Sequence, residues 1–137
     1  MPQHLLHYQT PGRGFTELTD DLRRWVAAQD VSAGLLHLFL RHTSASLILC
    51  ENADPDVLRD LEAWMARLVR DGDAQFRHRA EGPDDMAAHI RSVLTANSLS
   101  VPVVDGALEL GTWQGLYLWE HRHQPHRRSL RLSLLAA

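Results

Sequence analysis

The sequence predicts an α+β domain with about three helices and mainly antiparallel strands. In the first two thirds of the chain, segments of helical periodicity alternate with apolar runs typical of strands, and the last third contains only short strand-like segments. Strands clustered in this way favour hairpin pairing over a doubly wound parallel sheet. The 137 residues contain no linker, internal repeat or low-complexity tract, so residues 1–137 are expected to form a single domain.

The composition limits the classes of partner and chemistry. The formal net charge is −3, which argues against nucleic acid as the partner, because such proteins usually carry a basic surplus. All 14 basic residues are arginine, so a lysine Schiff base and a lysine-dependent phosphate loop are excluded. Cys50 is the only cysteine and cannot form an internal disulfide, which predicts a cytoplasmic location. We see no export signal and no run of 18 apolar residues, so no membrane partner is expected.

The amino-terminal segment predicts a strand, a tight turn, a return strand and a helix. His4 to Gln9 alternates loosely, and Pro11 to Gly14 is a strong turn signal before a return strand from Phe15 to Leu18. Thr19 is the predicted N-cap of the helix, because the apolar residues that follow it recur at helical spacing. These are Leu22, Trp25 and Val26.

Residues 35–52 form the stretch around which the chain is organised. Two apolar runs, 35–40 and 45–50, flank the polar residues His42, Thr43 and Ser44. Such runs are typical of strands buried on both faces, and a buried helix is the competing interpretation. The hydroxyls of Thr43 and Ser44 favour a turn between the two runs.

Two further helices are predicted before the chain turns to strands. The first opens at Asp54 and Pro55 and stops at Gly72, and the second opens at residues 83–85 and closes at residues 97–98. The residues of the second helix expected to face the core are Met86, Ile90, Val93 and Leu94. Asp105-Gly106, a preferred hairpin dipeptide, joins the next two predicted strands. The strands expected here are 100–104, 107–110, 116–120 and 129–135.

His78, Asp85 and His89 form a candidate metal site. Asp85 and His89 are four residues apart on a predicted helix, so they lie on one face, and His78 precedes that helix. Two imidazoles and a carboxylate can hold a divalent metal with open positions for water or substrate. Alternatively, Asp85 only stabilises the helix dipole and pairs with His89 on the surface. The same helix start is also a favourable place for a phosphate.

A second candidate combines His42, Thr43, Ser44 and Glu51. No Gly-x-Ser-x-Gly elbow is present, so general acid/base chemistry for His42, with hydroxyl contacts to an anion, is a better assignment than a hydrolase triad. The alternative is a turn histidine flanked by hydroxyl caps.

Trp113 and Gln114 lie between two glycines, which indicates a tight loop that presents an indole and an amide to a flat ring. The alternative is that Trp113 fills the core. His121, His123 and His126 either chelate a metal or lie in a solvated turn.

Several blocks of the sequence in combination resemble the YjbQ-like family, whose members are often labelled secondary thiamine-phosphate synthase. The resemblance covers nearly the whole chain. The blocks are His42-Thr43-Ser44-Ala45-Ser46-Leu47, Glu51-Asn52, His78, Asp84-Asp85-Met86-Ala87-Ala88-His89-Ile90, Gly106 and Leu110-Gly111-Thr112-Trp113-Gln114.

The resemblance implies a sandwich-like domain of two packed sheets that assembles as a homotrimer. It also implies one pocket lined by the matching residues, namely His42, Ser44, Glu51, His78, Asp85, His89, Trp113 and Gln114. The implied activity is a transferase that joins a pyrimidine pyrophosphate to a thiazole phosphate and releases pyrophosphate. In that activity Mg²⁺ on Asp85 or Glu51 would neutralise the leaving group.

We therefore expect His42, Ser44 and Glu51 to be catalytic, and His78, Asp85 and His89 to hold Mg²⁺ or Zn²⁺. The residues expected to bind a small phosphorylated substrate are Thr43, Asn52, Trp113 and Gln114. Two alternatives to the transferase stay open at this point. One is a metal-dependent hydrolase or phosphatase, and the other is a non-catalytic trimer that binds a metabolite or a metal.

Overall fold

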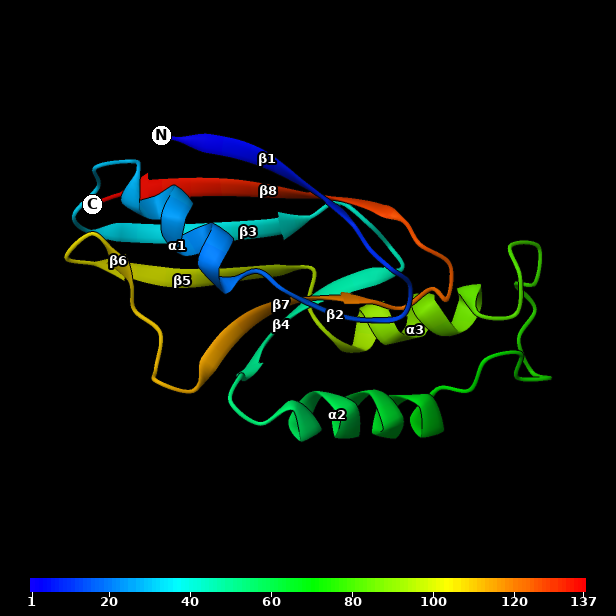
Figure 1. Ribbon diagram of the computed structural model, residues 1–137. Helices are drawn as coiled ribbons and strands as arrows, with labels where there is room; N and C mark the ends of the chain where they lie inside the picture. The colour runs from blue at the N-terminus through cyan, green and yellow to red at the C-terminus, as the bar shows by residue number, and fades with distance from the viewer.

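The computed structural model describes residues 1–137, which form two antiparallel sheets and three helices (Figure 1). The larger sheet has the order β1-β8-β3-β5-β6, and the smaller sheet has the order β2-β7-β4. The larger sheet comprises β1 (Gln3–Gln9), β8 (Arg127–Ala136), β3 (Gly34–Leu40), β5 (Ser98–Val104) and β6 (Ala107–Leu108). The smaller comprises β2 (Gly14–Glu17), β7 (Gln114–Glu120) and β4 (Ala45–Glu51). The helices are α1 (Thr19–Ala27), α2 (Pro55–Leu68) and α3 (Asp85–Leu94). The predicted α+β fold of two mainly antiparallel sheets is confirmed.

The main core lies between the two sheets and is closed by α1. It is built largely from leucines of β3, β7 and β8, and Leu22 and Val26 of α1 join them. In β3 the side chains alternate, so Leu36 and Leu38 are fully buried while Leu35 and Phe39 are exposed. The prediction that the apolar run 35–40 is buried on both faces is therefore wrong for the single chain. The reason is that only the inner face of the larger sheet packs against another layer.

A smaller core lies on the other side of the small sheet, where α2 and α3 pack. Met65, Val69, Ala87 and Trp119 form it. The predicted start of α2 is confirmed, since the Asp54 side chain accepts a hydrogen bond of 2.9 Å from the Asp56 amide. The predicted N-cap at Thr19 is wrong, because the cap position is Leu18.

The residues of α3 that face the core differ from the predicted ones. It turns Ala87, Ala88 and Arg91 inward. Val93 and Leu94 are 83% and 56% exposed, so their predicted core positions are wrong. None of the three helices is both long and apolar enough to cross a membrane.

Strand β4 separates the predicted site residues into two groups. It begins directly after His42, Thr43 and Ser44, and it ends at Glu51. Antiparallel pairing with β7 places Gln114 opposite Glu51. At about 3.3 Å per residue, the two ends of this seven-residue strand are about 20 Å apart.

Candidate metal centre

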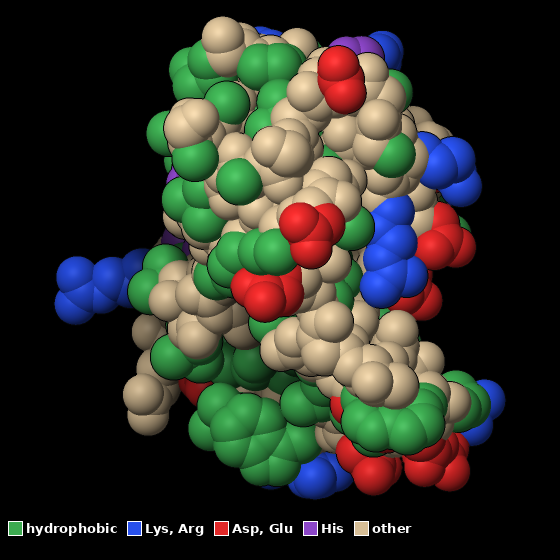
Figure 2. Space-filling view, turned by 90° about the vertical axis from the view of Figure 1, so that its left-hand side faces the viewer, with side chains coloured by type: hydrophobic (Ala, Val, Ile, Leu, Met, Phe, Trp, Pro, Cys, Tyr) green, Lys and Arg blue, Asp and Glu red, His purple; other side chains and the backbone are tan.

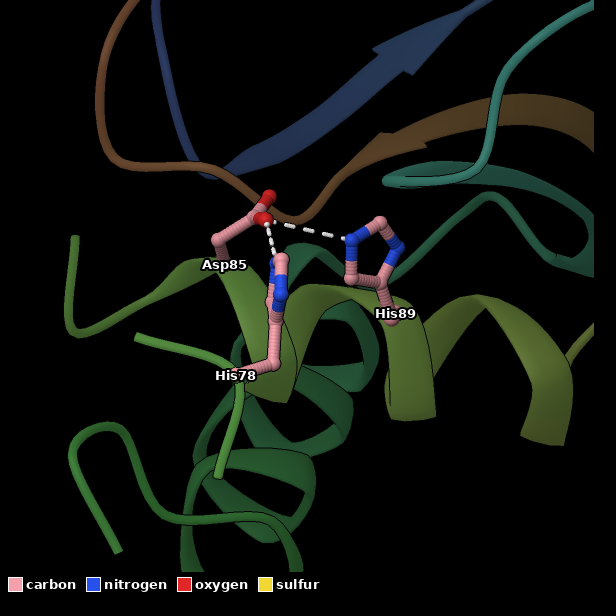
Figure 3. A group of neighbouring side chains, drawn as sticks. All are labelled: His78, Asp85 and His89. Atoms are coloured by element: carbon pink, nitrogen blue, oxygen red, sulfur yellow. Dashed lines mark hydrogen bonds and ion pairs between the residues drawn. The ribbon is translucent and has the colours of Figure 1, made fainter. Parts of the chain in front are cut away.

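His78, Asp85 and His89 converge at the amino-terminal end of α3 (Figure 3). Asp85 and His89 are one helical turn apart, and the loop before α3 brings His78 to the same carboxylate. Asp85 Oδ2 lies 2.7 Å from His78 Nε2 and 3.1 Å from His89 Nε2. One donor atom from each residue lies within 4.8 Å of the others. The structure therefore brings the three predicted metal ligands together.

Neighbouring groups orient two of these three side chains. His89 Nδ1 donates to the Thr43 carbonyl at 3.0 Å, which turns Nε2 toward Asp85, where a metal ion would take the place of the Nε2 proton. Arg122 donates from Nη1 to Asp85 Oδ1 at 2.8 Å, so only Oδ2 of that carboxylate faces the imidazoles. Arg122 also binds Asp84 and the Glu81 carbonyl. Asp85 Oδ2 and His89 Nε2 are therefore both held facing the same point.

Asp85 is a carboxylate in the folded protein although its side chain is only 6% exposed. Burial acts to raise the pKa of this carboxyl, but the hydrogen bond from His78 and the charges of His89 and Arg122 outweigh it. The pKa of Asp85 therefore lies below its usual range. His78 and His89 are 43% and 32% exposed, so the cluster opens to solvent on their side.

A cavity of about 350 Å³ lies beside His89. Its lining is mostly polar and uncharged, and the residues are His42, Thr43, His89, Ser92, Val93, Thr95 and Asn97. His42 Nε2 accepts a hydrogen bond of 2.7 Å from the Ser129 amide, so the neutral ring carries its proton on Nδ1. Burial and the nearby Arg128 charge lower the pKa of His42. His42 is thus a neutral hydrogen-bond donor rather than a base at Nε2.

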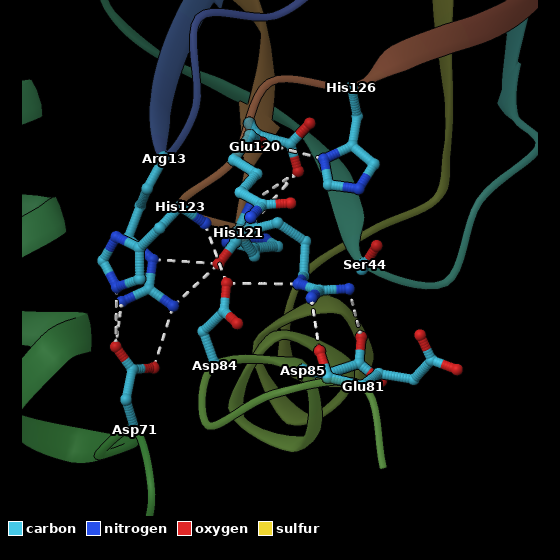
Figure 4. Close-up of polar contacts among 12 residues, drawn as sticks. Arg13, Ser44, Asp71, Glu81, Asp84, Asp85, Glu120, His121, His123 and His126 are labelled. Atoms are coloured by element: carbon cyan, nitrogen blue, oxygen red, sulfur yellow. Dashed lines mark hydrogen bonds and ion pairs between the residues drawn. The ribbon is translucent and has the colours of Figure 1, made fainter. Parts of the chain in front are cut away.

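Ser44 belongs to a buried ionic network and not to this cavity (Figure 4). Arg128 donates from Nη2 to Ser44 Oγ at 2.9 Å, and from Nε to Glu120 Oε1 at 2.8 Å. Thr10 also donates to Glu120, at 2.7 Å. Neither a histidine nor a carboxylate bonds the Ser44 hydroxyl, so its contacts are those of a positioning residue. Sequence reasoning missed Arg128, although the alternation at 130, 132 and 134 extends back to it and predicts an inward side chain.

The three histidines after β7 do not converge on a metal. His121 is fully buried, where Nδ1 accepts from Arg91 Nε at 3.0 Å and Nε2 bonds Ser46 Oγ at 2.7 Å. Burial and the adjacent Arg91 lower the pKa of His121 to about 2, so it is neutral. His123 bonds Asp71 instead, and His126 bonds a carbonyl. The interpretation as a solvated turn is wrong for His121, because β7 carries it into the core.

The remaining predicted residues lie at the far end of β4. Glu51 Oε2 accepts from the Ala53 and Asp54 amides at 3.1 and 3.0 Å. The Asn52 amide donates to the Trp113 carbonyl at 2.9 Å, and Gln114 Oε1 accepts from Gly111. Trp113 does not fill the core, since it is 63% exposed.

Within one chain, then, the expected single pocket does not form. One end of β4 gathers His42, Thr43, His78, Asp85 and His89. Ser44 is at the same end but belongs to the buried network of Arg128 and Glu120. The residues at the other end are Glu51, Asn52, Trp113 and Gln114. The reason is the extended strand between the two groups, whose length no side chain spans.

Comparisons with known proteins place this fold and sequence in one group. Residues 4–137 match the model of the family described as UPF0047 protein YjbQ-like. UPF0047 protein sll1880 from Synechocystis is 49% identical over 128 residues, which cover 93% of this chain and 87% of that protein. UPF0047 protein YjbQ from Escherichia coli O157:H7 is 45% identical, with 92% of each chain covered.

Solved structures agree with the sequence comparison. The conserved hypothetical protein TT1486 from Thermus thermophilus has a TM-score of 0.84 and 36% identity, and the match covers 96% of this chain and 99% of that one. The hypothetical protein APE1520 from Aeropyrum pernix has a TM-score of 0.91 and 26% identity over the full length of both chains. The chain belongs to the YjbQ-like UPF0047 family.

Proposed function

We propose that this protein is a divalent-metal-dependent enzyme that hydrolyses a small phosphorylated molecule. In this proposal His78, Asp85 and His89 hold the metal, and the cavity beside His89 holds the substrate. The observation that carries it is the convergence of three donor atoms within 4.8 Å next to a polar cavity of about 350 Å³. The fold alone does not define the reaction, because one fold hosts many chemistries.

The donor set suits a zinc-like ion better than magnesium. Two donors bound to one ion at about 2.1 Å lie roughly 3.0–3.4 Å apart, close to the separations of Asp85 Oδ2 from the two imidazoles. Imidazole nitrogen is a preferred ligand of Zn²⁺ and other first-row transition metals, whereas Mg²⁺ prefers oxygen ligands only. Such an ion would supply Lewis-acid activation of a phosphoryl oxygen.

The side chains around the cavity would orient the substrate, and Arg122 would hold Asp85 in place. Thr43, Ser92 and Asn97 offer uncharged hydrogen-bonding groups along the cavity. His42 would donate from Nδ1 to a phosphoryl or leaving-group oxygen, because its Nε2 is engaged by Ser129. Arg122 would keep Asp85 ionised and in place.

Transfer with loss of pyrophosphate, as in a thiamine-phosphate synthase, is the second candidate. Membership in the YjbQ-like family and the matching blocks around His42, Asp85 and Trp113 favour it. Release of pyrophosphate from the two thiamine precursors would support the transferase. Release of phosphate from a phosphomonoester such as p-nitrophenyl phosphate would support the hydrolase. Stable binding of a metabolite or metal with neither release would support a non-catalytic binder.

We also propose that the protein works as a cytoplasmic homotrimer. Exposed apolar side chains on β3, β5 and β8 support assembly, since such a face is typical of subunit contacts. These are Leu35, Phe39, Val104 and Leu135. The single free Cys50 supports a reducing compartment.

Measuring the metal content of the protein tests directly whether His78, Asp85 and His89 hold an ion. Protein stripped with a chelator and dialysed against Zn²⁺ should retain one ion per chain. His78→Ala and His89→Ala should lose that ion, because each removes one of three ligands. His37→Ala is the matched control, since this histidine lies on the outer face of β3 and bonds only Ser100. Equal zinc content in His89→Ala and in wild type would contradict the proposal, as would equal loss in His37→Ala.

A further inference from the structure

The cavity beside the metal centre is lined by hydrogen-bonding groups that have no partner in the chain. His42 uses only Nε2, in a 2.7 Å bond from a main-chain amide, so the proton on its Nδ1 has no partner. Thr43 is held by its carbonyl, which accepts from His89 at 3.0 Å, and its hydroxyl bonds nothing. Asn97 is likewise held by its carbonyl, which accepts from the Leu40 amide at 2.8 Å, and its side-chain amide bonds nothing. The lining therefore offers an imidazole N–H, a hydroxyl and an amide to a ligand.

Two further hydroxyls of the lining can accept hydrogen bonds. Ser92 donates its own proton to the Ala45 carbonyl at 3.4 Å, and Thr95 donates to the Arg91 carbonyl at 2.8 Å. A hydroxyl that donates one bond can still accept others, so both oxygens can receive a proton from a ligand. Because a ligand hydroxyl both donates and accepts, it is the group that suits this mixed lining.

No cationic side chain lines the cavity. The chain has no lysine, and the lining contains no arginine. Arg128, whose charge acts on His42, is 5% exposed and paired with Glu120. An anionic group in the cavity would therefore be compensated only at the metal centre, to which His89 also belongs. A second phosphate farther along the cavity would lose water without gaining a counter-charge.

The cavity is also small, and its lining has little to offer an aromatic ring. Its volume of about 350 Å³ is at the lower end of the range for ligand pockets, about 300–1,000 Å³. Val93 is the only hydrophobic residue of the lining, and the only rings are the two imidazoles. The cavity therefore suits a polar body of the size of glycerol or a single sugar.

A cavity at the other end of the molecule provides a comparison. Its volume is about 410 Å³, and it is formed by the end of α1, the segment after it and the turn between β5 and β6. Asp30 and Asp105 both line it. Figure 2 views this end of the molecule and shows acidic side chains spread over it. Two carboxylates repel a phosphorylated ligand, so of these two cavities only the one beside His89 suits an anion.

We infer that the substrate of the proposed reaction is the phosphate monoester of a small neutral polyol or sugar. This inference rests on the proposed function, which places the phosphoryl group at the metal. The polyol then lies in the cavity, where Thr43 and Asn97 bond its hydroxyls and determine specificity. In the reaction the oxygen of water bonds to phosphorus, the bond from phosphorus to the polyol oxygen breaks, and that oxygen takes up a proton from the water. The products are inorganic phosphate and the free polyol.

Binding of two phosphonates tests this substrate class without turnover, because neither contains an ester bond that can be hydrolysed. In the phosphonate analogue of glycerol phosphate a methylene group replaces the ester oxygen, and both hydroxyls are kept. Butylphosphonate has the same chain and charge but no hydroxyl. Sites that bond a hydroxyl reject the analogue that lacks it, so zinc-loaded protein should bind the dihydroxy compound at least about tenfold more tightly, measured by isothermal titration calorimetry. A ratio below about tenfold would overturn the inference.

Two variants show whether the cavity makes this distinction. Thr43→Val removes the hydroxyl and keeps the carbonyl that holds His89, and Asn97→Ala removes the amide. Each should lower the ratio of the two Kd values about threefold or more, because each removes one hydrogen bond to the polyol. Gln3→Ala is the matched control, since its amide bonds Ser133 on the outer face of the larger sheet. The same ratio in all three variants would contradict the role of Thr43 and Asn97.

The same samples distinguish this inference from the proposed function. Equal binding of both phosphonates, in protein that retains zinc and releases phosphate from p-nitrophenyl phosphate, would overturn only the substrate class. The expected preference in protein that releases no phosphate would overturn hydrolysis and support the class of ligand. Protein that binds neither zinc nor either phosphonate would overturn both.

Discussion

Replacing Arg128 by methionine should strongly destabilise the protein, because it leaves the Glu120 carboxylate buried without its partner. Arg128 and Glu120 are 5% and 1% exposed, and the carboxylate also accepts from Thr10 and from two main-chain amides. Removing one member of a buried ion pair costs about 3–5 kcal/mol. With an unfolding entropy of about 2.1 cal/mol/K per residue, that loss lowers Tm by about 10–17 °C.

Urea unfolding of Arg128→Met, followed by tryptophan fluorescence, measures the loss directly. Arg59→Met is the matched control, because the Arg59–Asp56 pair is 74% and 68% exposed and should contribute at most about 1 kcal/mol. The double variant Glu120→Gln/Arg128→Met should recover part of the loss, since no charge is then left unpaired. If Arg128→Met loses no more stability than Arg59→Met, the description of this pair as a buried network is refuted.

Three further predictions concern other parts of the fold. His121 has a folded-state pKa of about 2 but takes up a proton near pH 6.5 when unfolded, so stability is full above about pH 6.5. Stability should fall by up to about 1.4 kcal/mol per pH unit as the pH drops toward 2, and urea titrations of His121→Gln should show a shallower slope. Asp54→Ala removes the cap of α2 and should cost about 1 kcal/mol, measured as a shift in the urea midpoint. Leu132→Ala empties a fully buried site between the sheets and should cost about 2–5 kcal/mol; a loss below 1 kcal/mol would contradict its core position.

Much of the local structure could be predicted because its causes lie within a few residues. Asp54 and Pro55 start α2 through a cap bond and a preset backbone angle, and both act on the adjacent turn. Asp85 and His89 share a helix face because of the helical repeat alone. The alternation along β8 likewise separates core from surface residues at a period of two.

The candidate site was only partly predictable, because its residues come together through contacts between distant parts of the chain. His78 reaches Asp85, and Arg122 fixes it, through chain segments that the sequence does not pair by any local rule. The charged residues around His121 favour a surface position, but the register of β7 against β4 carries it into the core.

By itself, the sequence determined which elements form, which residues can ligate a metal and to which family the chain belongs. Only the tertiary structure decided that the predicted metal ligands converge while Trp113 and Gln114 lie at the other end of β4, a strand about 20 Å long. The physical reason is that helical and strand periodicity act over a few residues. The distance between two loops depends instead on which strands pair and in what register, and that pairing is a property of the whole chain.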